Sequence, residues 1–443
     1  MRPFSREKTA MRRTLDALRS GDWITRERIR LVAIALLVAS VAGILVLVLT
    51  AHNGIDVKGR PLGTDFSNVY AAGTYVRDGH PEAPFDPEQQ FDRERALFGE
   101  TTQFYGWHYP PYFLLVAAVL AAMPYRLALA VWQAASLGLY LLMIAAMPFP
   151  AAGAPRKTEI LLLALAFPAV FINIGHGQNG FLTAALLGGA LLMLRERPAL
   201  AGILFGLLAY KPQFGLMIPL ALLAGGYWRC FIAAAVTVAL ATLVTTLAFG
   251  THIWAAFIAS TEFSRTVVLE QGNTGWYKIQ SVFSWARMWG APIALAYAAQ
   301  AAVTAAIAFA VVRLWRSAAP FALKGAALCL AAILATPYSL DYDLMVLAPA
   351  IAFLALDGVE HGFAPWEKTA LAALWLSPLI TRSVAQATLI PLGVPAMLTM
   401  FVLIVRRAGR CDVFPMTCLR SSPTIPKAGS GTPRGHDIAA FRS

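Results

Sequence analysis

The sequence predicts an all-α polytopic membrane protein, with about 12 transmembrane helices and a long first outer loop that carries short amphipathic helices. Composition and patterning both point to this fold class. Of the 443 residues, 58% are hydrophobic and 14% are charged, and the mean hydropathy is +0.61. Apolar runs recur from residue 30 to residue 405, separated by short polar loops. The chain is too apolar for a soluble protein, and a bilayer favours helices because they satisfy their own backbone groups.

A basic arm, residues 1–28, precedes the first apolar run, residues 29–50. This run has about 22 residues, more than the roughly 7–15 of a signal peptide's apolar region, and no small-residue cleavage pattern follows it, so we expect a retained span. The positive-inside rule places the arm in the cytoplasm. Its basic residues are Arg2, Arg6, Lys8, Arg12, Arg13, Arg19, Arg26 and Arg28.

The first outer loop, about residues 51–108, is the longest hydrophilic stretch between apolar runs and is rich in acidic residues. The next apolar segment, 110–123, is short enough to be either a short span or a re-entrant piece. If it turns back outside, the basic loops further along the chain all fall in the cytoplasm. We therefore favour the re-entrant interpretation, with both termini cytoplasmic.

The later apolar runs complete an integral-membrane domain at residues 29–407, with a second outer loop at about 250–290. Several runs are shorter than the roughly 20 residues of a full crossing. The tail, residues 408–443, is rich in Ser, Pro, Gly and Arg, and we expect it to be cytoplasmic and disordered. The predicted spans after the first are 126–147, 159–174, 178–194, 198–210, 212–227, 229–249, 291–315, 324–338, 343–357, 368–380 and 387–405.

Chemically distinctive residues gather at the outer ends of these spans. This topology puts five polar stretches on one membrane face, which suggests a single outward-facing site. The stretches are Asp65, residues 107–111, residues 175–179, residues 210–213 and residues 336–343.

In order and spacing these stretches resemble glycosyltransferase family 87, a branch of the GT-C superfamily that includes bacterial α-1,2-mannosyltransferases. The resemblance covers roughly residues 30–350. It rests on Asp65-Phe66 with Tyr70 and Ala72-Gly73, Tyr109-Pro110-Pro111, Gly177-Gln178-Asn179, and Ala201 to Gly206 leading to Lys211-Pro212.

This resemblance implies a GT-C-like bundle in the inner (plasma) membrane, with its active site on the outer, periplasmic side. It also implies a polyprenyl-phosphate sugar as donor, mannose as the hexose, and a lipid or glycan as acceptor. The acceptor hydroxyl must lose its proton as it attacks the sugar, so the reaction asks for a general base. We expect Asp65 to be that base, with the alternative that it only caps the helix that follows.

The departing phosphate asks for a cation, and Lys211 is the first candidate, with a snorkelling lysine at a span end as the alternative. We expect His108 and His176 to contribute to phosphate binding, or else to be packing residues at the interface. Gln178 and Asn179 suit sugar hydroxyls but would also suit helix caps. We add Tyr109, Tyr338 and Asp341 to the expected sugar and acceptor site. We expect no metal and no cofactor, because Asp341 and Asp343 alone are weak evidence for an ion site.

The net charge of +12 suits anionic lipid head groups better than nucleic acid, so membrane lipids are expected partners. The alternative function is a transporter or flippase of a lipid-linked or small polar substrate. Transport needs polar groups near the membrane midplane, whereas the polar stretches here lie at the outer ends of spans. A third possibility is an inactive relative that only binds polyprenyl lipids.

Overall fold

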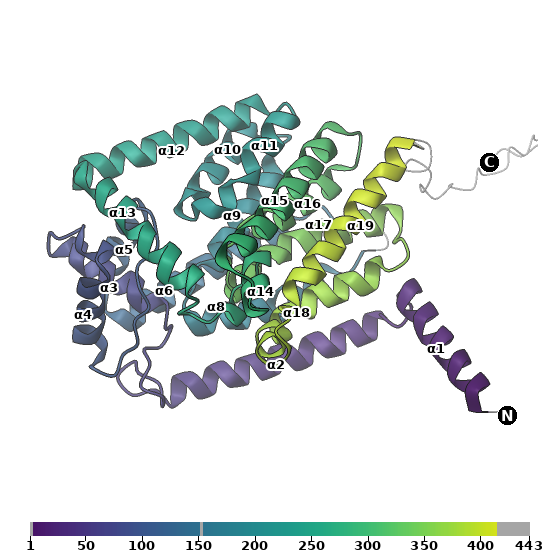
Figure 1. Ribbon diagram of the computed structural model, residues 1–443, viewed down its shortest axis with the longest axis horizontal. Coiled ribbons are helices and arrows are strands. Elements are labelled where there is room, and N and C mark those ends of the chain that lie inside the picture. Colours follow the sequence, from purple (N-terminus) through teal and green to yellow (C-terminus); the bar gives the residue numbers. More distant parts are fainter. Residues whose placement is uncertain (1–2, 151–153, 414–443) are drawn as a thin grey trace, which may run out of the picture.

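The computed structural model describes residues 3–150 and 154–413, and within these ranges all regular structure is helical. Figure 1 shows a bundle of long helices with the short helices α3, α4 and α5 at one end and α1 projecting from the other. The basic arm is largely helical, because α1 spans Pro3–Ser20 and α2 begins at Arg26. The predicted all-α class is confirmed for the described residues.

Among the described residues, five helices are long and apolar enough to cross a membrane by length and composition. A sixth crossing results if α7 (Lys157–Leu165) and α8 (Pro168–His176) are one span bent by 50°. The bend coincides with Pro168, which cannot continue the backbone hydrogen bonding of α7. The five are α2 (Arg26–Leu49), α6 (Tyr125–Ala145), α12 (Trp228–Phe249), α15 (Ile293–Arg316) and the joined η6 and α17 (Asp341–His361).

Four further apolar helices are shorter than a full crossing. The longest of them have 14 residues, a length of about 21 Å against a hydrocarbon core of about 30 Å. The number of about 12 spans therefore stays a prediction. The four are α9 (Gly180–Met193), α10 with η2 (Pro198–Tyr210), η3 with α11 (Pro212–Ala224) and α16 (Phe321–Leu334).

The C-terminal part of the bundle consists of α18 (Glu367–Thr388) and α19 (Gly393–Val413). α18 is longer than the predicted span 368–380. α19 continues past residue 408, where disorder was predicted to begin, so for residues 408–413 that boundary is wrong. The rest of the predicted tail, 414–443, lies outside the described residues.

The two segments predicted to be outer loops fold into short helices. α5 has eight residues, about 12 Å, so it is too short to cross a membrane by itself, in line with the re-entrant interpretation. The first segment holds α3 (Phe66–Arg77), η1 (Ala83–Phe85) and α4 (Pro87–Phe98), followed by α5 (Phe113–Leu120). The second holds α13 (His252–Phe263), the π-helix η4 (Ser264–Glu270), η5 (Trp276–Lys278) and α14 (Val282–Met288).

The first outer loop was expected to carry short amphipathic helices, but the first two turns of α3 are buried in the protein. Phe66 is fully buried, and its ring centroid lies 5.6 Å from that of Tyr125. A Cβ at Gly73 would lie 2.1 Å from the carbonyl oxygen of Ala117 in α5. Gly73 is therefore needed for the close approach of α3 and α5, and this packing fixes the start of α3 relative to the bundle.

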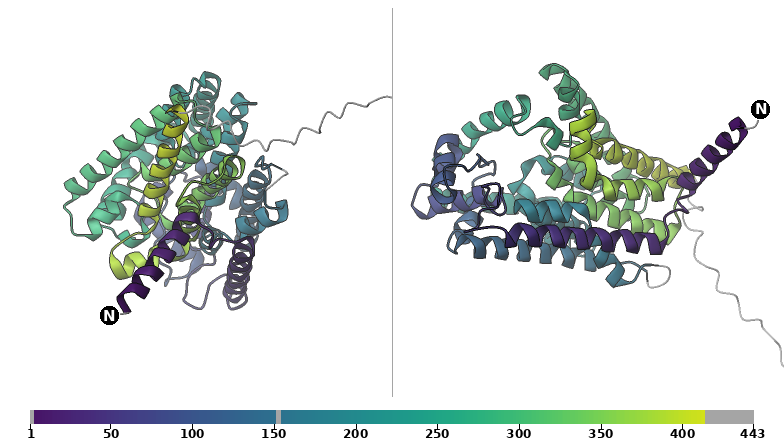
Figure 2. Two further views of the ribbon diagram at one scale, coloured as in Figure 1. Left: turned by 90° about the vertical axis from the view of Figure 1, so that its right-hand side faces the viewer. Right: turned by 90° about the horizontal axis from the view of Figure 1, so that it is seen from below.

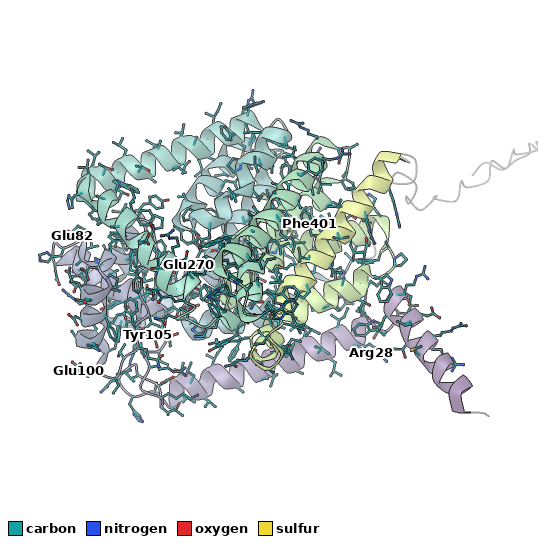
Figure 3. The ribbon with its side chains drawn as sticks, in the orientation of Figure 1. Arg28, Glu82, Glu100, Tyr105, Glu270 and Phe401 are labelled. Atoms are coloured by element: carbon teal, nitrogen blue, oxygen red, sulfur yellow. The ribbon has the colours of Figure 1, made fainter. Side chains whose placement is uncertain are left out.

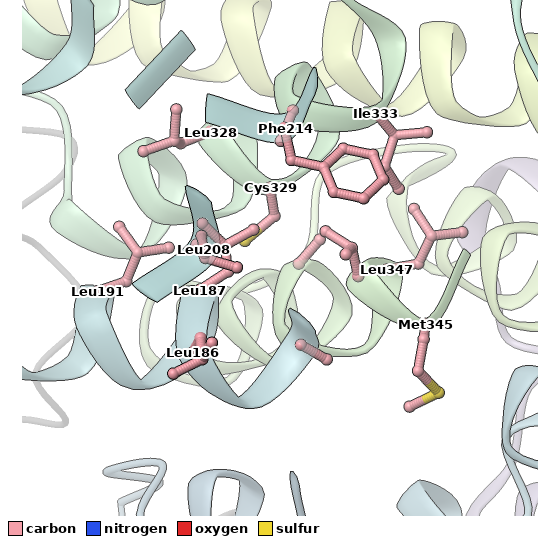
Figure 4. Close-up of a cluster of buried hydrophobic side chains, with 14 of the residues drawn as sticks. Leu186, Leu187, Leu191, Leu208, Phe214, Leu328, Cys329, Ile333, Met345 and Leu347 are labelled. Atoms are coloured by element: carbon pink, nitrogen blue, oxygen red, sulfur yellow. The ribbon is translucent and has the colours of Figure 1, made fainter. Parts of the chain in front are cut away.

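The bundle core is packed from helices distant in sequence. Figure 4 shows Leu187, Leu208, Phe214 and Cys329 meeting in a cluster of buried apolar side chains. α10 packs on α12 through Gly202 and Gly206, four residues apart. A Cβ at Gly202 would lie 2.4 Å from the Cys230 carbonyl oxygen, as expected for small residues at a membrane-type helix contact.

Candidate functional site

Asp65 stands at the start of α3 and meets residues of the α8–α9 turn. Its carboxylate accepts hydrogen bonds from Gln178 Nε2 at 2.7 Å and from the Thr64 hydroxyl at 3.3 Å. His176 Nδ1 lies 3.7 Å from the carboxylate and 2.7 Å from Thr64 Oγ1. The Asp65 and His176 side chains remain 20% and 31% exposed, so this cluster is accessible from outside the protein core.

Backbone contacts also hold Asp65 and His176 together. Asp65 N–H donates to the His176 carbonyl at 2.9 Å, which ties the start of α3 to the end of α8. α8 ends because Gly177 adopts a left-handed conformation with φ 65°. A Cβ there would lie 2.5 Å from Phe66 Cβ, so glycine also permits the contact.

Asp65 occupies the N-cap position of α3, yet its side chain makes no capping hydrogen bond. Both carboxylate oxygens are directed at the cluster instead. Burial alone would raise the pKa of Asp65, but the charge of His176 and the hydrogen bonds from His176, Gln178 and Thr64 outweigh it and hold the pKa below the usual value of an aspartate. The carboxylate is therefore ionised at neutral pH and keeps lone pairs for a further donor.

A buried hydrogen-bond chain extends from this cluster into the bundle. Tyr109 donates to Gln178 Oε1 at 3.3 Å, and Asn179 Nδ2 donates to the Tyr109 hydroxyl at 2.8 Å. Asn179 precedes α9 without capping it through its side chain, and its Oδ1 is buried with no partner among the described residues. The two amides thus position Tyr109 and Asp65, and neither side chain caps a helix.

Lys211 is 4% exposed and pairs with Asp343, with Nζ 2.5 Å from Oδ1. The snorkelling alternative is therefore wrong, because the ammonium points into protein. Nζ also lies 5.2 Å from the centroid of the Tyr342 ring, and that ring is 6.5 Å from His176. Tyr342 thus separates the Lys211–Asp343 pair from the Asp65 cluster, and the charge of Lys211 is neutralised in this arrangement.

His108 contacts the π-helix η4, because its Nδ1 lies 2.8 Å from Ser264 Oγ. Its ring centroid is 6.5 Å from that of Tyr338. Burial lowers the pKa of His108 to about 4, and the nearby Asp65 charge offsets this only in part. His108 is therefore neutral at pH 7 and brings a hydrogen-bonding group to the site without a charge.

Asp341 is buried, and its partner is Arg382 of α18, with Nη1 3.4 Å from Oδ2. The Arg382 side chain is 37% exposed, the largest exposure among the site cations Lys211, His176 and Arg382. Its guanidinium carbon also lies 5.8 Å from the centroid of the Tyr277 ring. This part of the site therefore presents an accessible, permanently charged group.

Glu94 of α4 is fully buried below the loop that carries His108 and Tyr109. It accepts hydrogen bonds from the Tyr105 backbone N–H at 3.0 Å and from Gln90 Nε2 at 3.2 Å. Burial raises the pKa of Glu94 to about 7, since the hydrogen bonds offset it only in part and Asp65 adds a repulsive charge. Figure 3 places Tyr105 near the end of the molecule where Glu82 and Glu100 lie.

A cavity of about 160 Å³ opens beside the cluster. Gly63, Thr64 and His176 line this cavity. Leu47 of the exposed apolar helix α2 lines it as well. In the part of the chain that the structure describes, no group of three or more His, Cys, Asp or Glu side chains is arranged to hold a metal ion.

Comparison with known proteins decides the family. The model of glycosyltransferase family 87 matches residues 107–337. The chain belongs to this family. No curated protein and no solved structure matches it. Membership and the apolar helices together indicate a membrane glycosyltransferase, which acts with a sugar donor and an acceptor.

The structure of this family 87 glycosyltransferase brings all five predicted polar stretches into one chain of contacts. Tyr109, Gln178, Asn179 and Lys211 lie inside the matched range, whereas Asp65 precedes it and Asp341 follows it.

Sequence reasoning missed Thr64, Tyr342, Glu94 and Arg382. The signal for Arg382 was present, because it is a lone cation between the apolar runs 368–380 and 387–405, as Lys211 is between two others. No comparable signal marks Glu94, which is one acid among many in the outer loop until folding buries it.

Proposed function

We propose that this glycosyltransferase moves a hexose, mannose, from a polyprenyl-phosphate donor to a lipid or glycan acceptor, with Asp65 as general base. The observation that carries the proposal is the Asp65 carboxylate itself. It is ionised, partly exposed, and oriented by Gln178 and Thr64 rather than used as a helix cap. A general base must be held in this way to meet a substrate proton.

In the proposed reaction the acceptor hydroxyl oxygen attacks C1 of the donor sugar. Its proton passes to an Asp65 carboxylate oxygen, the bond between C1 and the phosphate oxygen breaks, and polyprenyl phosphate leaves with the electron pair of that bond. His176, 3.7 Å from Asp65, keeps the base ionised until the proton arrives. We place the sugar or acceptor hydroxyls near Tyr109, Asn179 and Tyr338.

The leaving phosphate needs positive charge, and burial separates the candidates. Lys211 already has a carboxylate partner in a sealed environment, so binding a phosphate there would leave Asp343 unpaired. Arg382 is accessible and its planar guanidinium can form two hydrogen bonds to phosphate oxygens. We therefore assign the donor phosphate to Arg382 and His176, with neutral His108 as a further hydrogen-bonding group. Lys211 supports the site through Asp343.

Charge asymmetry supports the proposed placement of the site at the outer, periplasmic face of the inner membrane. α2 has 24 residues, about 36 Å, which is enough to separate the two sides of a bilayer. Figure 3 labels Arg28 at one end of the molecule and Glu82 and Glu100 at the other, near α3 and α4. The positive-inside rule then puts the Asp65 end outside. The cavity that reaches from His176 to Leu47 would give a lipid-linked donor access from the bilayer.

The test is to reconstitute the full-length protein and supply polyprenyl-phosphate mannose labelled in the sugar together with membrane lipid extract. A new labelled glycoside supports the transferase proposal. Labelled donor that crosses the vesicle membrane without a new glycoside would support the flippase alternative, and donor binding with neither outcome would indicate an inactive relative. Replacing mannose by glucose in the donor tests the sugar assignment.

A further inference from the structure

A second cavity lies at the end of the bundle opposite Asp65, where α1, the α17–α18 loop and α19 meet. Its volume is about 480 Å³. Figure 2 shows purple α1 beside the yellow-green C-terminal helices and away from the short helices α3 to α5. The residues that line the cavity are Leu15, Asp16, Arg19, Ala364, Pro365, Trp366, Glu367, Leu403, Arg406, Arg407 and Arg410.

Hydrogen bonds between α1 and the start of α18 hold the two sides of this cavity together. Trp366 N–H donates to the Arg19 carbonyl at 2.7 Å, and the Thr369 hydroxyl donates to the Leu18 carbonyl at 2.7 Å. Gly21 follows α1 with φ 71°, and a Cβ there would lie 2.6 Å from Lys368 Cβ. The backbone at Arg19 is thus held by contacts made on both sides of it.

The charges in the cavity are unevenly matched. Arg407 contacts two carboxylates, Glu367 at 2.5 Å and Asp357 at 2.6 Å, and is satisfied by them. Arg19, Arg406 and Arg410 form no ion pair with any side chain that the structure describes, although Asp16 also lines the cavity. Three guanidinium groups therefore line a space of molecular size without a carboxylate partner among the described side chains.

We propose that this cavity binds the headgroup of an anionic phospholipid from the leaflet that faces α1. Guanidinium groups suit phosphate oxygens because they offer several donors in a fixed plane. The apolar wall favours a lipid over a soluble phosphate, since Leu15 is 47% exposed and Trp366 is 42% exposed at the cavity. Tryptophan and arginine together are typical of the membrane interface, and Met11, one turn before Leu15, extends the exposed apolar surface of α1.

The bound lipid would hold α1 against the C-terminal helices from the membrane side. This role does not depend on the proposed sugar transfer, because the cavity lies at the other end of the bundle from Asp65. A failed transferase assay would therefore leave the lipid site untouched, and the reverse also holds.

The experiment titrates the detergent-solubilised full chain with phosphatidylglycerol or phosphatidylcholine and counts bound lipids by native mass spectrometry. The wild type should bind one phosphatidylglycerol at least tenfold more tightly than phosphatidylcholine. Arg406→Gln with Arg410→Gln should abolish a tenfold preference, because each basic group near a lipid headgroup contributes about fivefold in affinity and two together contribute about 25-fold. The single change Arg410→Gln should give an intermediate preference and leaves Arg407 and its carboxylates intact.

The matched control is Arg12→Gln with Arg13→Gln, which removes the same charge from α1 outside the cavity. Its preference should stay within about twofold of wild type. Equal losses in the two double variants would overturn the proposal in favour of diffuse attraction, as would a wild type without a preference. Full displacement of phosphatidylglycerol by 10 mM glycerol phosphate, an excess of about ten-thousandfold over a Kd of about 1 μM, would identify a soluble phosphate as the ligand and overturn the lipid assignment.

Discussion

The Asp65 cluster and the Lys211–Asp343 pair both join a carboxylate to a basic side chain, but the two regions differ in burial. Asp65 and His176 are 20% and 31% exposed, and their closest approach is 3.7 Å. The side chains of Lys211 and Asp343 are 5% and 2% exposed and approach to 2.5 Å. The open pair can accept a substrate without losing its protein contacts. The sealed pair can do so only by leaving a buried charge uncompensated.

The difference in burial separates residues that we expect to act on the substrate from residues that we expect to stabilise the fold of the site. In the open region a change of charge should alter turnover while the fold survives, because water or substrate can solvate the remaining partner. In the sealed region the same change should alter the free energy of unfolding first. Substitutions can therefore test whether a residue affects turnover or stability first.

Asp65→Asn should give the largest effect, a loss of turnover of about 10²–10⁴-fold at matched folded protein, since the amide cannot accept the proton. Stability should change little, because the side chain makes no capping hydrogen bond. Transfer from polyprenyl-phosphate sugar by the purified variant is the measurement. Asp65→Glu should also be poor, because the added methylene displaces the carboxylate from a fixed position.

Asp86→Asn is the matched control in the same outer segment. Asp86 is a true N-cap whose carboxylate accepts from the backbone N–H of Glu88 and Gln89. Asparagine caps about as well as aspartate, so this variant should keep wild-type activity and stability. If Asp65→Asn were as silent as Asp86→Asn, Asp65 would be only a structural residue and the open region would lose its proposed base.

Lys211→Met should destabilise the protein by about 3–5 kcal/mol, because it leaves the Asp343 carboxylate buried without a cation. Lys211→Met combined with Asp343→Asn should recover most of that loss, and the measurement is denaturation of the purified variants in detergent. The donor KM of the folded fraction should stay close to wild type. A stable Lys211→Met protein with a greatly raised donor KM would indicate that Lys211 binds the donor phosphate. The two regions would then not differ in function.

Lys211 also illustrates how far the sequence could lead. A lone lysine between apolar runs identified an unusual position, and the order of motifs identified the family and the five stretches that meet. The partner of Lys211 is 132 positions away in sequence, and only folding decides whether it pairs with Asp343 or stays open. The burial of α3 was unpredictable for the same reason, since Gly73 reveals its role only against Ala117 of α5.

Glu94→Gln should remove a pH dependence of stability worth about 3 kcal/mol, as expected for a carboxyl whose pKa moves from 4.5 to about 7 on folding. The folded protein then binds more protons than the unfolded chain between these values. Wild-type stability should therefore fall as pH rises from about 4.5 to about 7. Thermal unfolding across this range should show the fall in wild type and in the exposed Glu88→Gln control, but not in Glu94→Gln.

This result would sharpen the comparison within the outer segment itself. Asp65 has a basic neighbour and a lowered pKa, whereas Glu94 has none and a raised one. An unchanged pH dependence in Glu94→Gln would mean that the carboxyl is solvated or paired, so burial alone would not distinguish the two acids.

Arg382→Gln should give the smallest of these effects, a rise of about tenfold in the donor KM with kcat changed less, because a hydrogen bond to a charged group contributes about 1.5–3 kcal/mol and His176 remains. Arg382→Lys should lie between this variant and wild type, since lysine keeps the charge but loses the planar pair of donors. The control Arg77→Gln removes an exposed arginine at the far end of α3 and should leave the donor KM unchanged. Steady-state kinetics with varied donor separates the outcomes. A fall in stability without a change in donor KM would show that Arg382 serves only to neutralise buried Asp341. The Arg382–Asp341 pair would then be structural, like the Lys211–Asp343 pair.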